Sequence, residues 1–272
     1  MPWVYDGGQN VDEVSRYPSI ITACAITTLA MVTAVISRLV VHRRRRRTVG
    51  TDGWITIVTA VFCLTYSGLA IVQSRRGLGL PIALRPRSTF YGFRVLSYAG
   101  KPFYMLALAG YKLAVCLTCL TMVQRAEAKR YRLVVKAIAT FVVLSHIVFT
   151  LLNFFNCWPV EKNFTPSISG YCLPFPPVQY TMAVTSILCD FIVFLLPLPV
   201  LLCRVAGSGS ITNNQHLVSA ATFACGVLTT VVSTARAVYL REVQNGNGDN
   251  TMVVLMGVVE INVGVWFPTD SQ

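Results

Sequence analysis

The amino-acid sequence predicts an all-α membrane protein: a bundle of seven transmembrane helices, the last of which is short or truncated. Hydrophobic residues make up 54% of the 272 residues and charged residues only 12%, about half of the charged share of a soluble domain. The apolar residues form long runs, and the basic residues behind the net charge of +12 lie in clusters between them. This pattern is typical of polytopic membrane proteins and argues against a nucleic-acid-binding surface.

Seven apolar segments have, or nearly have, the length of about 20 residues that a helix needs to cross a bilayer. The first covers residues 20–41, follows an acidic leader and ends at five arginines. A cleavable signal peptide has a basic leader and a shorter apolar stretch, so we expect this segment to be retained. The other segments are residues 54–72, 103–123, 133–155, 178–203, 217–240 and 251–267.

Basic clusters predict the orientation of the chain in the membrane. The arginines at 43–47 and the cluster at 125–136 fall on one side when seven helices are threaded, and the positive-inside bias makes that side cytoplasmic. Residues 75–101 carry six basic residues on the other side and depart from the bias. We therefore predict an extracellular or luminal N-terminus (1–19), a transmembrane domain (20–267) and a short tail (268–272). The kind of membrane is left open.

Four charged residues fall within the predicted membrane segments: Lys112, Asp190, Arg236 and Glu260. Such charges are costly in a bilayer and are usually paired or functional. At about 1.5 Å per residue, Lys112 and Glu260 lie roughly 13 Å below the outer ends of their helices, so they are placed to meet at similar depth. The charges form either an ion pair that fixes helix packing or a polar cavity that binds a ligand or moves a proton. Arg236, near its helix end, has the further option of reaching the interface.

Uncharged polar residues in the same segments extend this candidate polar site. Tyr111 and Asn262 are included in it. His146 and Asn153 accompany them on the fourth segment. A single histidine on an apolar helix is more often a packed, hydrogen-bonded residue than a catalytic one, and we interpret His146 in that way.

The loop between the fourth and fifth segments contains Cys157 and Cys172. If this loop faces an oxidising compartment, the two cysteines are expected to form a disulfide, which would stabilise the fold by about 3 kcal/mol in the chain-entropy model. Asn163 begins a glycosylation sequon in the same loop. Pro166 directly after the sequon weakens that prediction.

The sequence indicates no metal site and no cofactor. The seventh segment has no lysine to form a Schiff base with retinal, and the P-loop, dinucleotide-binding and H-E-x-x-H motifs are absent. Aspartate-rich motifs that would hold magnesium are absent as well. Cys116 and Cys119 form a C-x-x-C pair on an apolar helix, without a second pair or a nearby histidine. We interpret them as packing residues.

A series of polar, glycine and proline positions in a fixed order resembles the fungal rhodopsin-like seven-helix membrane proteins. This family includes receptor-like proteins and the membrane proteins of satratoxin-type secondary-metabolite clusters. The matching positions are Asp52, Trp54, residues 77–79, Lys101, Tyr104, residues 111–113, the loop from Cys157 to Cys172, Asp190, residues 197–199, Phe223, Gly226, Arg236, Glu260 and Asn262.

Three positions depart from the family pattern. Asp52 stands alone where two aspartates are usual, and residues 213–215 are Asn, Asn and Gln where basic residues are usual. Residues 267–269 replace the proline-containing end of the seventh helix and the long polar tail. These departures put signalling through a cytoplasmic tail in doubt.

The resemblance implies a membrane component of a fungal secondary-metabolite pathway or a receptor-like sensor. The four charges within the membrane favour, as the first hypothesis, an accessory or catalytic component that handles an apolar intermediate. Its cavity would be lined by Lys112, Asp190, Arg236 and Glu260. A receptor-like sensor is the alternative, although the short loop at residues 204–215 argues against it. A transporter of a small apolar metabolite is the third hypothesis, although no inverted repeat is visible. The expected partners are the lipid bilayer and either a small apolar metabolite or pathway enzymes. Whether the chain is an enzyme stays open, because fold does not determine function.

Overall fold

Seven α-helices account for most of the part of the chain that the computed structural model describes, namely residues 3–5, 15–44, 50–122, 129–197, 213–243 and 249–266. The predicted tail (268–272), Arg125 and most of the predicted N-terminus lie outside these residues. The helices are α2 (Tyr17–Arg44), α3 (Thr51–Ser74), α4 (Phe90–Met122), α5 (Lys129–Phe154), α6 (Phe175–Leu195), α8 (Asn213–Glu242) and α9 (Thr251–Gly264).

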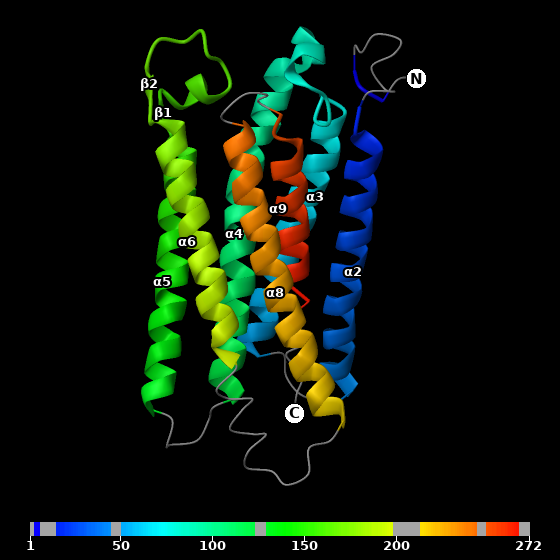
Figure 1. The fold of residues 1–272 in the computed structure, drawn as a ribbon, viewed down its shortest axis with the longest axis vertical. Coiled ribbons are helices and arrows are strands. Elements are labelled where there is room, and N and C mark those ends of the chain that lie inside the picture. Colours follow the sequence, from blue (N-terminus) through cyan, green and yellow to red (C-terminus); the bar gives the residue numbers. More distant parts are fainter. Residues whose placement is uncertain are drawn as a thin grey trace.

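The helices run along one axis and alternate in direction (Figure 1). Helix contacts in the order α2, α3, α4, α5, α6, α8, α9 and back to α2 close a ring. Helix α4 also packs across this ring against α6 and α9, which makes it the central element. We call the end of the bundle at which α2 begins the N-terminal end. Which end faces the cytoplasm stays a prediction.

Apolar side chains cover the outside of the bundle as well as its core. Ile26, Leu133 and Val231 are each more than half exposed, and many other large apolar side chains are exposed too. Lipid tails solvate such side chains, whereas water would not. Five helical stretches are long and apolar enough to cross a membrane: Tyr17–Val41, Thr51–Ser74, Arg87–Leu120, Lys129–Phe154 and Pro176–Leu195. Helix α8 is long but more polar, and α9 is apolar but short. The predicted all-α membrane bundle with a short last helix is confirmed.

The apolar run predicted that the third helix begins at residue 103. Helix α4 begins earlier, at Phe90. Its first turns carry Arg94 and Lys101, so the helix begins before the apolar run does. The guanidinium of Arg94 lies 4.6 Å from the ring centre of Phe90, so its charge is accommodated along the helix surface. Charged residues therefore limit the apolar run at this side, but they do not limit the helix.

The connection between α5 and α6 folds over the N-terminal end of the bundle (Figure 1). Strand β1 (Cys157–Trp158) pairs antiparallel with β2 (Tyr171–Cys172), and a disulfide joins Cys157 to Cys172 as predicted. Between the strands, the short 3-10 helix η4 (Val160–Asn163) ends at the sequon. The amide nitrogen of Asn163 donates to the carbonyl of Val160. Its glycosylation stays a prediction.

Close helix packing around α9 depends on glycine. A Cβ atom placed on Gly264 would lie 2.7 Å from two ring carbons of Tyr111, because the ring of Tyr111 lies flat against this glycine. The hydroxyl of Tyr111 is held by Asp190, so the ring has little freedom to move away. Small residues at such crossings let helix backbones approach closely in membrane proteins.

We predict that Gly264→Ala lowers the free energy of unfolding by about 1–3 kcal/mol, because the added methyl group overpacks the contact with Tyr111. Thermal and denaturant unfolding in detergent micelles measures the change. Gly68→Ala is the matched control, since nothing lies within 4 Å of its added Cβ. Equal stability of the two variants would contradict this account of the packing.

Candidate functional site

The four charged residues of the membrane segments lie inside the bundle. Lys112 and Glu260 are fully buried and Asp190 is 4% exposed. The side chain of Arg236 is 12% exposed. They come from four different helices, α4, α9, α6 and α8 respectively. Four charges enclosed in one bundle require close compensation, because removing a charge from water costs several kcal/mol.

The charges form two ion pairs. The ammonium Nζ of Lys112 lies 3.2 Å from Oδ1 of Asp190, and Nε of Arg236 lies 3.1 Å from Oε2 of Glu260. The expected meeting of Lys112 with Glu260 is wrong. Depth along a helix was the only guide, and depth does not tell which way a side chain points around the helix. Arg236 turns inward to Glu260 instead of reaching the interface.

Hydroxyl groups join the two ion pairs into one network. The Tyr111 hydroxyl donates to Oδ1 of Asp190 at 2.5 Å, and the Tyr104 hydroxyl donates to Oε2 of Glu260 at 2.6 Å. The Ser233 hydroxyl lies 2.8 Å from Oδ2 of Asp190 and 2.5 Å from Oε1 of Glu260. Every carboxylate oxygen in the network thus has a polar group at hydrogen-bond distance, although Asp190 Oδ2 and Glu260 Oε1 share the single hydrogen of Ser233.

Further contacts fix Lys112 and Arg236. The Lys112 ammonium donates to the carbonyl and the hydroxyl of Ser186, at 3.1 and 2.9 Å. The guanidinium of Arg236 lies 4.8 Å from the ring centre of Tyr104. Sequence reasoning missed Tyr104, Ser186 and Ser233 as members of the site. Helical spacing offers a signal for two of them, because Tyr104 precedes Tyr111 by two turns and Ser233 precedes Arg236 by one.

Two other polar residues noted in the sequence lie outside the network. The amide of Asn262 donates to the Val258 carbonyl at 2.8 Å and to the Ser67 hydroxyl at 3.3 Å, so it joins α9 to α3. His146 is buried, and its Nδ1 lies 2.8 Å from the carbonyl of Val142 on its own helix. Both contacts are those of structural residues.

A cavity of about 160 Å³ lies between the network and the N-terminal end of the bundle. Arg236 and Tyr104 are the members of the network that line it, whereas Lys112, Asp190 and Glu260 lie behind them. Of the four charges that the sequence was expected to place around a cavity, Arg236 lines this one. The lining residues are Tyr66, Leu69, Ala70, Gln73, Leu96, Ser97, Gly100, Lys101, Tyr104, Met105, Asn153, Gln179, Met182, Arg236, Leu240, Val243, Asn250, Val253 and Val254.

The walls of this cavity are mostly apolar, with polar groups at a few positions. Gln179 donates to Oδ1 of Asn153 at 3.2 Å, which holds one pair of amides in the wall. Gln73 donates to Ser97 on another part of the wall. Arg236 supplies a charge at the end nearest the network. An apolar enclosure with a few placed polar groups is the usual character of a small-molecule site.

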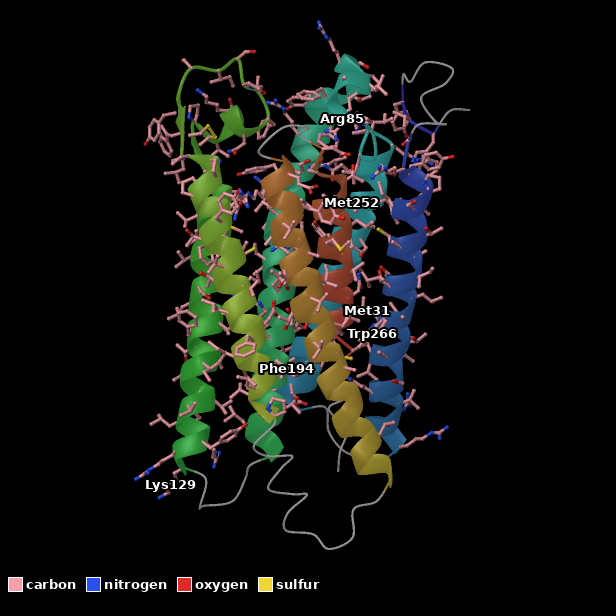
Figure 2. The ribbon with its side chains drawn as sticks, in the orientation of Figure 1. Met31, Arg85, Lys129, Phe194, Met252 and Trp266 are labelled. Carbon is pink, nitrogen blue, oxygen red and sulfur yellow. A yellow bond between two sulfur atoms is a disulfide. The ribbon has the colours of Figure 1, made fainter. Side chains whose placement is uncertain are left out.

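Polar contacts hold the chain together at the N-terminal end of the bundle. Arg85 lies at this end (Figure 2). Its Nη2 lies 3.6 Å from Oδ1 of Asp249, and its Nε donates to the carbonyl of Leu80. The backbone N–H of Gly79 donates to the Thr251 hydroxyl. Burial lowers the pKa of Arg85, and the carboxylate of Asp249 acts in the opposite direction. These contacts attach the α3–α4 connection to the start of α9.

We predict that Lys112→Met lowers the free energy of unfolding by about 3–5 kcal/mol, because it leaves the Asp190 carboxylate buried without its cation. Adding Asp190→Leu in the same chain is expected to recover much of the loss. Denaturant unfolding in micelles measures both effects, and Lys129→Met is the control because Lys129 is exposed. A double variant as unstable as Lys112→Met alone would show that the ion pair is not the cause.

Comparison with known proteins places the chain in a family. The model of the fungal rhodopsin domain matches residues 37–266. A protein described as "Wortmanamides biosynthesis cluster protein C", from Talaromyces wortmannii, is 23% identical over 164 residues, which cover 59% of this chain and 45% of that relative. No solved structure matches the chain. Because the family model covers most of its length, this chain belongs to the fungal rhodopsin domain family.

Proposed function

We propose that this protein is a multi-pass membrane component of a fungal secondary-metabolite biosynthetic pathway. It binds an apolar intermediate in the cavity between the ionic network and the N-terminal end of the bundle. The observation that carries the proposal is the mostly apolar cavity between Arg236 and the N-terminal end of the bundle. The similarity to a protein named for a biosynthesis cluster supports the pathway, although the match spans less than half of that relative.

The position of the cavity suits an apolar molecule that travels in or near a bilayer. Leu69, Met105 and Val254 supply apolar walls, and Asn153 and Gln179 supply hydrogen-bonding groups. A ligand with an apolar body and a polar end would satisfy both kinds of wall. With the N-terminus extracellular or luminal, as the basic clusters predict, the cavity lies in the extracellular or luminal half of the membrane.

The geometry favours holding a molecule over transforming it. Asp190 and Glu260 are the carboxylates that would serve as general bases, and both are engaged by cations and hydroxyls behind Arg236 and Tyr104. A base needs a proton of the substrate within hydrogen-bond reach. We therefore propose an accessory role, in which the protein holds an intermediate for a partner enzyme.

We predict that deletion of the gene abolishes one metabolite of the source organism and causes its precursor to accumulate. Comparative metabolite profiling of wild-type and deletion strains measures this. Complementation with Gly100→Leu should fail to restore the product, because Gly100 lines the cavity and a leucine there takes up its space. The wild-type gene and Gly68→Leu, whose added Cβ has open space, should restore it.

Unchanged metabolites in a deletion strain would reject the pathway role, and a receptor-like sensor would then be tested through the external signals that the strain fails to answer. If Gly100→Leu restored the product at normal expression, the cavity would not be needed for the role in the pathway. In that case the protein would act in the pathway without holding a molecule at this place.

A further inference from the structure

The Ser233 hydroxyl stands between two carboxylates but has only one hydrogen to donate. It is 1% exposed, and its oxygen lies 2.8 Å from Asp190 Oδ2 and 2.5 Å from Glu260 Oε1. When both carboxylates are ionised, one of these two contacts contains no hydrogen. Lone pairs then face each other at hydrogen-bond distance in a medium of low dielectric, which is unfavourable.

One additional proton satisfies both contacts at once. With the proton on Glu260, the carboxyl donates to the Ser233 oxygen and Ser233 donates to Asp190. With the proton on Asp190, both donations run in the opposite direction. The two arrangements contain the same atoms and differ in the positions of two hydrogens. Two carboxyl groups in one site resist simultaneous ionisation, which favours holding one proton between them.

The extra proton changes the charge of the network. Lys112 and Arg236 balance Asp190 and Glu260 when both acids are ionised, so a network with one held proton carries one net positive charge. The other titratable groups packed around the two acids are neutral in their ordinary state and do not cancel it. They are Tyr66 on α3, Tyr104 and Tyr111 on α4, His146 on α5 and Cys189 on α6.

The cavity offers one route by which an anion can balance this charge. Arg236 lines the cavity, whereas Lys112 is fully buried and donates to Ser186. With the proton on Glu260, Arg236 loses its ionised partner and is open to an anion from the cavity. Lys101 adds a second cation to the walls, and the described lining residues include no aspartate or glutamate.

We propose that the cavity binds the carboxylate end of an apolar ligand at Arg236, while the bridge of Glu260, Ser233 and Asp190 holds the proton that balances it. The inference rests on the proposed function and names the ligand class. A carboxylate is favoured because it brings a single charge and fits the planar guanidinium.

Infrared spectroscopy of the purified wild-type protein tests the proton directly. The sample is the full chain in a maltoside detergent, which has no ester carbonyl to overlap the signal. At neutral pH we expect the carbonyl stretch of a protonated carboxylic acid, with a shift in deuterated water. The band should disappear in Glu260→Gln and in Asp190→Asn. A wild-type spectrum with ionised carboxylates only would overturn the proposal.

Calorimetry with octanoate and octanol tests the ligand class. We expect octanoate to bind wild-type protein at least tenfold more tightly than octanol, and Arg236→Gln to remove this preference. Glu260→Gln imitates the protonated acid and should bind octanoate at least as tightly as wild type. Asp190→Asn should weaken octanoate binding, because an ionised Glu260 then keeps Arg236. The opposite signs of these two variants distinguish the proposal from simple damage to the network.

The outcomes separate the two proposals. Equal binding of octanol and octanoate to wild-type protein would leave the cavity as an apolar-ligand site and overturn the carboxylate. Binding of neither would overturn the ligand cavity and with it the carboxylate. A loss of octanoate binding in Glu260→Gln, with octanol binding unchanged, would show that Glu260 supports Arg236 only as an anion.

Discussion

Compensation of four charges within the bundle is the constraint on which the rest of this structure depends. A charged side chain at the centre of a bilayer costs about 2.5–3.5 kcal/mol even on insertion-based scales. Lys112, Asp190, Arg236 and Glu260 become acceptable only when α4, α6, α8 and α9 hold them at one level and in one orientation. Pairing therefore determines the register of four helices at once.

Close packing between helices is what allows the network to form. The flat contact of Tyr111 with Gly264 brings α4 against α9, and the hydroxyl of the same tyrosine reaches Asp190 on α6. Helices separated by larger side chains would stand too far apart for hydrogen bonds between them. The apolar packing and the polar network thus depend on each other, with Tyr111 belonging to both.

The division of the network between buried and accessible members connects structure to function. Lys112 is enclosed by Asp190 and Ser186, and its contacts are those of a structural cation. Arg236 performs the same pairing with Glu260, yet it also lines the cavity. A ligand in the cavity would therefore meet the network at Arg236 and Tyr104, and would affect the remaining charges only through them.

The bundle follows from the amino-acid sequence, because apolar runs of membrane-spanning length leave few alternatives to helices in a bilayer. The sequence also indicated the four buried charges and the pairing of Cys157 with Cys172, since both follow from residue type and place in the chain. Which charges pair, and that Arg236 alone of the four lines the cavity, became clear from the folded bundle. Those outcomes depend on the rotation of each helix about its axis and on contacts between distant segments, which linear spacing does not specify.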